Sequence, residues 1–149
     1  LKNNQPQAAA WVTGNTSAPQ LSGLVKFYDT PYGGILIESE LFGLPNIQTS
    51  GSSDFYAMHI HENGDCSQSF TKTGEHYNPQ HRLHPYHAGD LLPVLGNQGY
   101  AWEAFYDKRF SISNILGRSV VIHSDSDDFS SQPSGNSGNK IGCGMIRRV

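Results

Sequence analysis

Apolar and polar residues alternate along several short stretches of the chain. The clearest stretch is 35–42, in which Ile35 and Ile37 share one face while Glu38 points to the other. A side-chain period of two is typical of an antiparallel strand with one buried and one solvated face. The segment 21–29 alternates in the same way, and short segments at 8–14, 55–61, 100–106, 119–123 and 141–146 predict further strands.

The same pattern argues against a helical protein. No long stretch repeats apolar residues at spacings of three and four. Sixteen glycines and eight prolines are spread along the chain and divide it into short segments. Short strands separated by turn residues predict an all-β sandwich or barrel. A length of 149 residues suits a single domain over 1–149, in which the polar segment 1–7 is expected to be a disordered amino-terminal tail.

Charge and hydropathy argue against a nucleic-acid partner and against a membrane span. The net charge is −3 and the basic residues are scattered, whereas nucleic-acid binding needs a basic face. No apolar run approaches the ~18 residues of a membrane span. The polar amino end is what a chain would show after removal of an export signal. The sequence therefore predicts no nucleic-acid partner and no membrane span.

The two cysteines, Cys66 and Cys143, leave two alternatives open. Both can be buried free thiols, as in many cytosolic proteins. If paired, they would close a long loop, a constraint worth about 4 kcal/mol in the chain-entropy model, which is disputed. No other cysteine competes for the pairing, and this favours an oxidising compartment.

Two long irregular stretches, 62–93 and 124–140, interrupt the strand pattern. Loops of more than ~15 residues in a compact domain are usually functional or disordered. All but one of the seven histidines lie between His59 and His87, most of them in the first loop. Imidazole is the commonest neutral ligand for zinc and copper, so this clustering predicts a metal site.

The spacing of the histidines sharpens this prediction. His59 and His61 are separated by one residue in a strand pattern, which sends both rings to one face, although most such pairs are surface residues. His123 ends an apolar run and would, by itself, be a core histidine. A further group has the spacing H-x7-H-x2-H-x2-D, with the members His76, His84, His87 and Asp90. Three imidazoles and one carboxylate match a closed, four-coordinate zinc site of the structural kind.

Taken in order, six motifs resemble the copper/zinc superoxide dismutases, most closely the bacterial branch. They are HIHENGDC (59–66), GEHYNP (74–79), HPYHAGD (84–90), GRSVVIH (117–123), SDD (126–128) and GNSGNKIGCG (135–144). The resemblance covers roughly 12–146. It implies a Greek-key β-sandwich or barrel of about eight antiparallel strands with two long functional loops. It also implies one copper and one zinc per chain, and conversion of superoxide to dioxygen and hydrogen peroxide by Cu(II)/Cu(I) cycling.

The resemblance also assigns roles to individual residues. Copper would be held by His59, His61, His76 and His123, and zinc by His76, His84, His87 and Asp90. His76 is in both sets because the family bridges its metals with one imidazolate, and its ring is expected to deliver a proton. Asp127 resembles the carboxylate that orients a copper histidine and a zinc histidine. Cys66 and Cys143 fall on the family's disulfide positions, and His81 is left over as a loop surface residue.

Three features depart from the family's pattern. Lys140 stands where the family has an arginine that guides the anion; lysine keeps the charge but loses the bidentate fork. The segment 128–134 is shorter than the guidance loop of the animal enzymes and contains no lysine or glutamate. Glu75 precedes His76, where many relatives have proline, and adds a negative charge. Together these features predict weaker steering of superoxide.

Two other functions fit part of the pattern. One is a domain that carries or buffers copper or zinc without turnover. The other is an extracellular β-module with a zinc-stabilised loop, which leaves His59, His61 and His123 unexplained. The complete ligand set favours the enzyme, because fold alone does not decide function. Superoxide is then the substrate, and the extracellular space or cell envelope the expected location. The sequence leaves a homodimer open.

Overall fold

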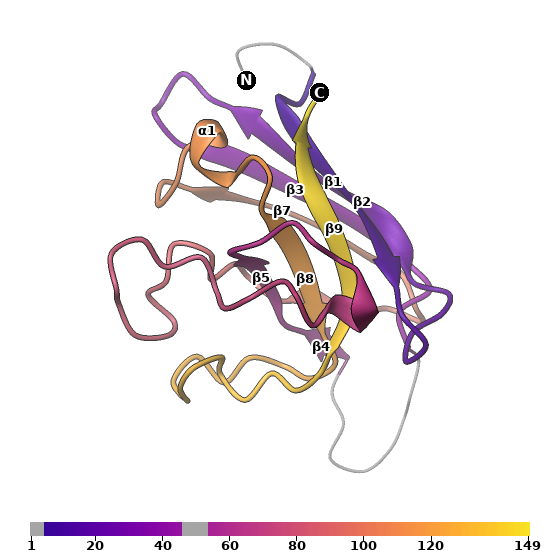
Figure 1. Cartoon of the computed structure of the whole chain (residues 1–149). Helices are drawn as coiled ribbons and strands as arrows, with labels where there is room; N and C mark the ends of the chain where they lie inside the picture. The colour runs from indigo at the N-terminus through magenta and orange to yellow at the C-terminus, as the bar shows by residue number, and fades with distance from the viewer. Residues whose placement is uncertain (1–4, 46–53) are drawn as a thin grey trace.

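The computed structural model describes residues 5–45 and 54–149, and its regular structure is almost entirely antiparallel β-strand. Seven strands form one curled sheet in the order β5-β8-β9-β1-β2-β3-β7, and two short strands form a second sheet (Figure 1). The strands are β1 (Ala8–Gly14), β2 (Ser22–Asp29), β3 (Ile35–Phe42), β4 (Phe55–Tyr56), β5 (Met58–His61), β6 (Val94–Leu95), β7 (Ala101–Asp107), β8 (Ser119–His123) and β9 (Lys140–Arg148). The predicted all-β barrel class is confirmed.

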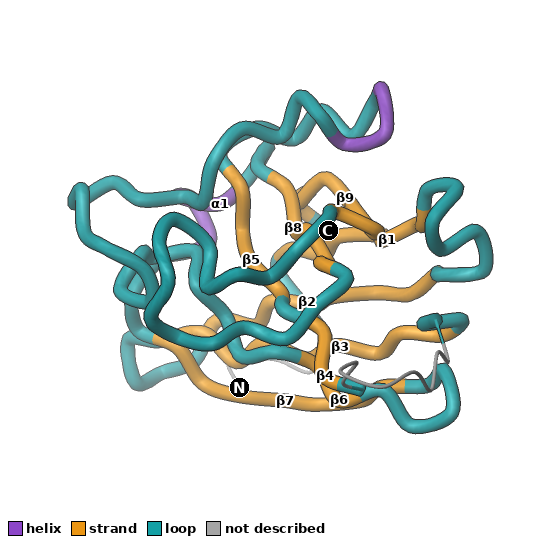
Figure 2. Tube along the Cα trace, turned by 90° about the horizontal axis from the view of Figure 1, so that it is seen from below, coloured by secondary structure: helices purple, strands orange, loops and turns teal. Residues whose placement is uncertain are grey.

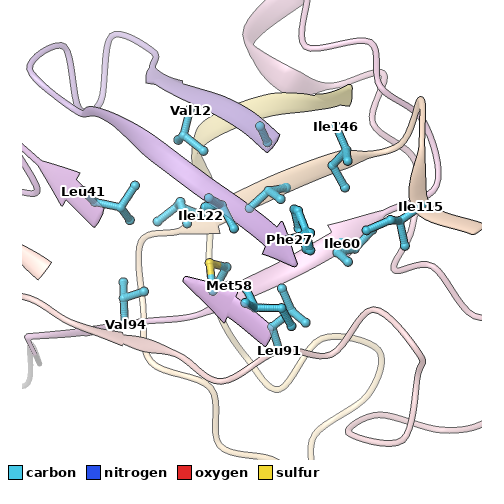
Figure 3. Close-up of a cluster of buried hydrophobic side chains, with 14 of the residues drawn as sticks. Val12, Phe27, Leu41, Met58, Ile60, Leu91, Val94, Ile115, Ile122 and Ile146 are labelled. Atoms are coloured by element: carbon cyan, nitrogen blue, oxygen red, sulfur yellow. The ribbon is translucent and has the colours of Figure 1, made fainter. Parts of the chain in front are cut away.

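The hydrophobic core lies on the inner face of the curled sheet. Along β1 and β3 buried residues alternate with more exposed ones, as a period of two requires. Strands β1, β2, β3, β5, β8 and β9 all send fully buried side chains into one cluster (Figure 3), namely Val12, Phe27, Leu41, Ile60, Ile122 and Ile146. Burying each such side chain contributes about 1.5–3 kcal/mol. This core fixes β5 and β8, the strands that carry histidines.

The predicted strand at 55–61 is two strands in the structure. β4 pairs with β6, whereas β5 pairs with β8. Between them, the Ala57 N–H donates to the Asp125 carbonyl at 3.0 Å, and the Ala57 carbonyl accepts from the His123 N–H at 2.9 Å. The chain changes its pairing partner at Ala57, and alternation of side chains along one segment does not reveal such a change.

Three short elements were not predicted. They are β6, the single helical turn α1 (Ile112–Ile115) and the 3-10 turn η1 (Gln68–Phe70). The side chain of Asn114 accepts the Ser111 N–H at 3.2 Å at the start of α1, and both isoleucines of the turn are buried. Elements of two to four residues are too short to produce a recognisable period.

Two long loops connect the strands that carry the site. The first, 62–93, lies between β5 and β6, and the second, 124–139, lies between β8 and β9 (Figure 2). A disulfide between Cys66 and Cys143 joins the first loop to β9, with Cα atoms 5.8 Å apart. The predicted pairing is confirmed, and the bridge ties the first loop to the sheet.

Backbone hydrogen bonds attach the amino-terminal segment to the sheet at Gln7, one residue before β1. Residues 1–4 of the predicted tail lie outside the described residues, so disorder there stays a prediction. Gln7 donates its N–H to the Phe27 carbonyl at 2.9 Å, and its carbonyl accepts from the Val149 N–H at 3.1 Å. Within 5–45 and 54–149, no helix is long and apolar enough to cross a membrane.

Candidate metal centre

Strands β5 and β8 bring three histidines together. β5 carries His59 and His61, and β8 pairs with it in antiparallel register and ends at His123. The pairing of β8 with β9 is irregular between Ile122 and His123. An irregularity of this kind turns a side chain away from the regular pleat, and it accompanies the placement of the His123 ring beside the other two.

The first loop is laid along β5 by backbone hydrogen bonds. The Ile60 N–H donates to the Gly89 carbonyl and the Tyr77 N–H to the Ile60 carbonyl, both at 2.8 Å. A Cβ on Gly89 would lie 2.4 Å from the Ile60 carbonyl oxygen, so only glycine permits this approach. These bonds place His76 and Asp90, the neighbours of Tyr77 and Gly89, next to β5.

Four histidines form the first group of converging nitrogens. One ring nitrogen from each of His59, His61, His76 and His123 lies within 4.8 Å of the others, and all four residues are buried. Nε2 of His61 is 3.3 Å from Nε2 of His123, and Nδ1 of His61 is 2.9 Å from the Gly74 carbonyl oxygen. The four residues that resemblance assigns to copper are therefore adjacent in space.

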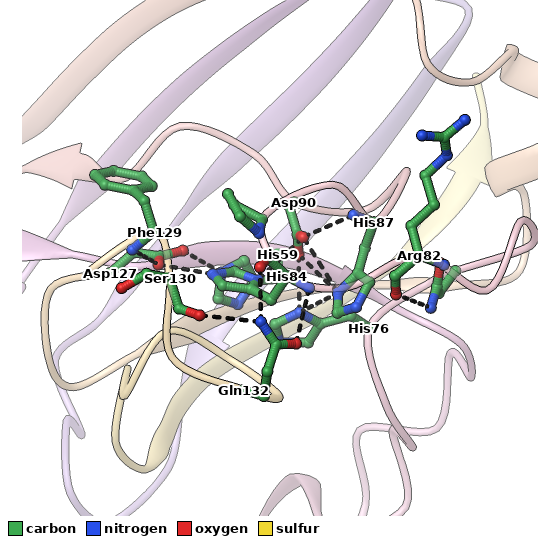
Figure 4. A network of polar contacts seen from close by, with 12 residues as sticks. His59, His76, Arg82, His84, His87, Asp90, Asp127, Phe129, Ser130 and Gln132 are labelled. Carbon is green, nitrogen blue, oxygen red and sulfur yellow. Dashed lines mark hydrogen bonds and ion pairs between the residues drawn. The ribbon is translucent and has the colours of Figure 1, made fainter.

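The second group surrounds Asp90. By the same 4.8 Å criterion it contains His59, His76, His84 and Asp90. His87 lies in the same cluster, since its Nδ1 is 3.2 Å from Nδ1 of His76 and 3.1 Å from Oδ2 of Asp90. Nδ1 of His76 is 2.8 Å from Oδ1 of Asp90, and Nδ1 of His84 is 3.0 Å from Oδ2 (Figure 4). The three histidines assigned to zinc thus surround the carboxylate of Asp90, the fourth residue of the set.

Several nitrogens in these groups are buried without a hydrogen-bond partner. Within the described part of the chain, this holds for Nδ1 of His59, Nε2 of His76, Nδ1 of His84 and Nδ1 of His123. Nδ1 of His84 is close to Asp90 but lacks hydrogen-bond geometry. A buried polar atom without a partner is costly, and a metal ion would satisfy those of His59, His76 and His84. Copper and zinc therefore fit the residues present.

Asp127 links the two groups through their outer nitrogens. Its Oδ2 lies 2.9 Å from Nε2 of His59, and its Oδ1 lies 2.7 Å from Nε2 of His84. A ring that donates one N–H to a carboxylate presents its other nitrogen as a lone pair. Asp127 thereby directs Nδ1 of His59 to the first group and Nδ1 of His84 to the second.

Burial favours the neutral form of four site histidines, His59, His61, His87 and His123. It lowers the pKa of His59 and His61 well below the usual range, and neighbouring histidines lower it further. Burial also lowers the pKa of His87, and that of His123 to about 3. For Asp90, burial alone would raise the pKa, but the hydrogen bond from a histidine ring and nearby histidines lower it overall. Neutral imidazoles and an ionised carboxylate are the forms that bind metals.

A cavity of about 240 Å³ lies beside the first group. His61, His76, His123, Glu75 and Lys140 are among its lining residues. The Lys140 ammonium donates to Oγ1 of Thr73 at 2.7 Å and to the Gly74 carbonyl at 3.3 Å. Burial lowers the pKa of Lys140. The cavity thus contains one exposed acidic side chain and one half-buried basic side chain.

Three further residues complete the comparison between the predicted site and the structure. His81, expected on the loop surface, is exposed. Arg109 and Gln132 were not predicted, yet both donate hydrogen bonds to the backbone of the loop that carries His84 and His87. Their partners are carbonyl groups, which every residue has, so no sequence motif could have revealed them.

The chain resembles one protein family over most of its length. The family model described as copper/zinc superoxide dismutase (SODC) matches residues 21–146. Superoxide dismutase (Cu-Zn) 3 of Arabidopsis thaliana is 33% identical over 156 residues, covering 94% of this chain and 89% of that protein. The extracellular superoxide dismutase (Cu-Zn) of Mus musculus is 34% identical, covering 86% of this chain. The match covers 54% of the mouse protein, so this chain spans about half of its length.

A solved structure agrees over the whole chain. The structure described as that of the clock protein EA4 superimposes with a TM-score of 0.81 at 30% sequence identity. The superposition covers 99% of this chain and 98% of the other. The arrangement of strands and loops is therefore shared along nearly the full length of both chains.

Proposed function

This chain belongs to the copper/zinc superoxide dismutase family, and we propose that the two histidine groups described above carry the reaction of that family. The chain is an oxidoreductase that converts superoxide to dioxygen and hydrogen peroxide. The family uses copper and zinc. When bound, copper supplies one-electron redox chemistry, which zinc does not supply.

The proposed copper ligands are His59, His61, His76 and His123. The single observation that carries this assignment is the convergence of four buried ring nitrogens within 4.8 Å beside a cavity. Nδ1 of His59 and Nε2 of His76 are buried without a hydrogen-bond partner in the described residues. Low pKa values keep His59, His61 and His123 neutral and ready to bind.

The proposed zinc ligands are His76, His84, His87 and Asp90. Three imidazoles and one carboxylate complete a four-coordinate site, the composition of a structural zinc centre. His76 faces both groups, because its Nδ1 lies beside Asp90 while its Nε2 is buried on the other side of the ring. Asp127 is proposed to orient His59 and His84 from behind.

Two residues are proposed to act on the substrate. His76 lines the cavity, and its Nε2 can hold one of the two protons that hydrogen peroxide formation requires. Lys140 lines the same cavity and places a positive charge where an anion enters. Its ammonium is anchored by Thr73 and Gly74, so the charge has a fixed position.

The test is superoxide decay after pulse radiolysis, on protein whose copper and zinc contents are measured in the same sample. We expect fast decay in proportion to bound copper, at one copper and one zinc per chain. Slow decay with one copper per chain would overturn the enzymatic assignment in favour of a metal carrier. Decay that does not follow bound copper would overturn the proposed site.

We further propose that the chain acts outside the cell or in the cell envelope. We also propose that it is a bacterial-type member of the family, folds as a single domain and forms a homodimer. The Cys66–Cys143 disulfide and the extracellular relatives support export. The motifs quoted above support the bacterial branch, whereas the relatives named here come from a plant and an animal. Cell fractionation tests the location. Sedimentation tests the dimer, because a monomer has a mass of 16.3 kDa.

A further inference from the structure

The segment 84–90 carries three of the four proposed zinc ligands on irregular backbone. In the described residues it contains no helix and pairs with β5 only through an isolated bridge between Asp90 and His59. Backbone hydrogen bonds join Gly89 to Ile60 and Tyr77. The rest of an irregular segment of this kind is free to move unless side chains hold its backbone groups. Two residues outside the segment do this.

Arg109 holds the carboxyl-terminal half of the segment. It follows β7, and one guanidinium nitrogen donates to the His87 carbonyl at 3.2 Å and to the Pro85 carbonyl at 3.4 Å. The other terminal nitrogen donates to the Asp90 carbonyl. One planar group therefore binds three carbonyls of the segment, two of which belong to proposed ligand residues.

Asp107 fixes the orientation of this guanidinium. Its Oδ2 accepts from Nη2 of Arg109 at 2.9 Å, and its Oδ1 accepts from Nε of Arg109 at 3.2 Å. Asp107 is buried at the end of β7. Charge-assisted pairs with two contacts constrain geometry more strongly than single neutral bonds. The Arg109 fork is thus anchored to the sheet.

Gln132 holds the amino-terminal end of the segment. Its side-chain oxygen accepts the His84 N–H at 2.9 Å, and its side-chain nitrogen donates to the His84 carbonyl at 2.8 Å (Figure 4). The same nitrogen donates to the Ser130 carbonyl at 3.0 Å. Gln132 belongs to the second loop, so both backbone groups of one ligand residue are fixed from a separate part of the chain.

We propose that Arg109 and Gln132 are positioning residues of the zinc site, which hold the backbone of 84–90 in its ligating conformation before metal binds. The inference rests on the proposed zinc ligands. Neither residue touches the ion. The free energy of binding includes the cost of ordering flexible ligands, and a segment already held in place avoids that cost. Residues that orient metal ligands commonly contribute 10–100-fold to affinity.

The experiment measures zinc affinity by chelator competition on the metal-stripped, disulfide-intact chain. Arg109→Met and Gln132→Met remove the hydrogen bonds while keeping an unbranched side chain of similar length. We expect each to weaken zinc binding by about 10–100-fold. Arg109→Lys keeps the charge and loses the fork, so it should recover only part of the affinity. A cavity of about 380 Å³ borders Arg109, so the two replacements of Arg109 are not crowded.

Two further readouts separate positioning from general stability. Arg148→Met removes the positive charge of an exposed side chain at the end of β9 and should leave zinc affinity unchanged. Amide exchange within 84–90 should accelerate in metal-free Arg109→Met and Gln132→Met. Zinc dissociation constants of Arg109→Met and Gln132→Met within twofold of wild type would overturn the inference, even if the melting temperature fell. A wild-type chain that binds no zinc would instead overturn the proposed ligands.

Discussion

His76 has two ring nitrogens in different surroundings. Nδ1 is 2.8 Å from Asp90, whereas Nε2 is buried without a hydrogen-bond partner in the described residues. Asp127 creates a similar asymmetry for His59 and His84 by occupying one nitrogen of each. Because an imidazole can offer a lone pair only from a nitrogen that carries no proton, the Asp127 contacts leave Nδ1 of His59 and Nδ1 of His84 for the proposed metals.

Replacement of His61 by alanine separates the two metals. We expect His61→Ala to lower copper-dependent superoxide decay by at least ~100-fold, because loss of a ligand should exceed the usual cost of losing an outer contact. Zinc content should stay near one per chain, since His61 is not among the proposed zinc ligands. His81→Ala is the control, because His81 is an exposed loop histidine. Full activity in His61→Ala would contradict the copper assignment.

Glu103 gives the stability of the chain a predictable dependence on pH. Its side chain lies largely within the fold, its Oε1 has no hydrogen-bond partner in the described residues, and burial raises its pKa to about 7. Between pH 4.5 and 7 the folded chain therefore binds more protons than the unfolded chain, and this contribution to stability is lost as pH rises through 7.

Glu103→Gln should remove this loss. We expect the variant to be more stable than wild type at pH 8 by about 1 kcal/mol, less than the full shift implies because the side chain is partly exposed. The difference should shrink at pH 5, where Glu103 is protonated in the folded chain. Urea unfolding at both pH values measures it. Equal gains at both pH values would show that ionisation of Glu103 is not the cause.

At the scale of whole elements, the strands and the extent of the two long loops could be predicted from sequence, whereas the side-chain contacts to the loop backbone could not. The segments 8–14 and 35–42 match β1 and β3 because a half-buried strand alternates buried and exposed side chains. The segment 119–123 matches β8, in which every residue is buried, because a short apolar run also fits a strand. The division of 55–61 depended on pairing with distant strands. The ligand set was predicted from side-chain motifs, but Arg109 and Gln132 act on backbone carbonyls, which leave no mark in the sequence.

The disulfide connects two such elements, the first loop and β9. Removing it in the Cys66→Ser/Cys143→Ser double variant should lower the free energy of unfolding by about 4 kcal/mol, because the unfolded chain gains freedom over a 77-residue separation. Urea unfolding at fixed metal content measures the change, and reduced wild-type protein is the matched comparison. A loss below about 1 kcal/mol would show that strain in the folded state offsets the entropic effect.

For the molecule as a whole, superoxide approaches a chain of net charge −3, so the local field at the cavity must oppose the overall charge. Lys140 and Glu75 both line the cavity and act on the anion with opposite signs. A unit charge ~7 Å from the superoxide anion in water changes the energy of the anion by about 0.6 kcal/mol. This energy corresponds to a factor of about 3 in the rate of encounter. Lys140→Met should therefore slow superoxide decay about threefold at low salt, and Glu75→Gln should accelerate it by a similar factor.

The decisive comparison is with a charge change of equal size elsewhere. Glu40→Gln alters the net charge as Glu75→Gln does, but Glu40 lies on β3, outside the lining of the cavity. If local steering governs the rate, Glu40→Gln leaves decay nearly unchanged. The effects at Lys140 and Glu75 should also weaken at 0.15 M salt, where the Debye length is about 8 Å. An equal acceleration in Glu40→Gln and Glu75→Gln would instead show that the rate follows the net charge of the whole molecule.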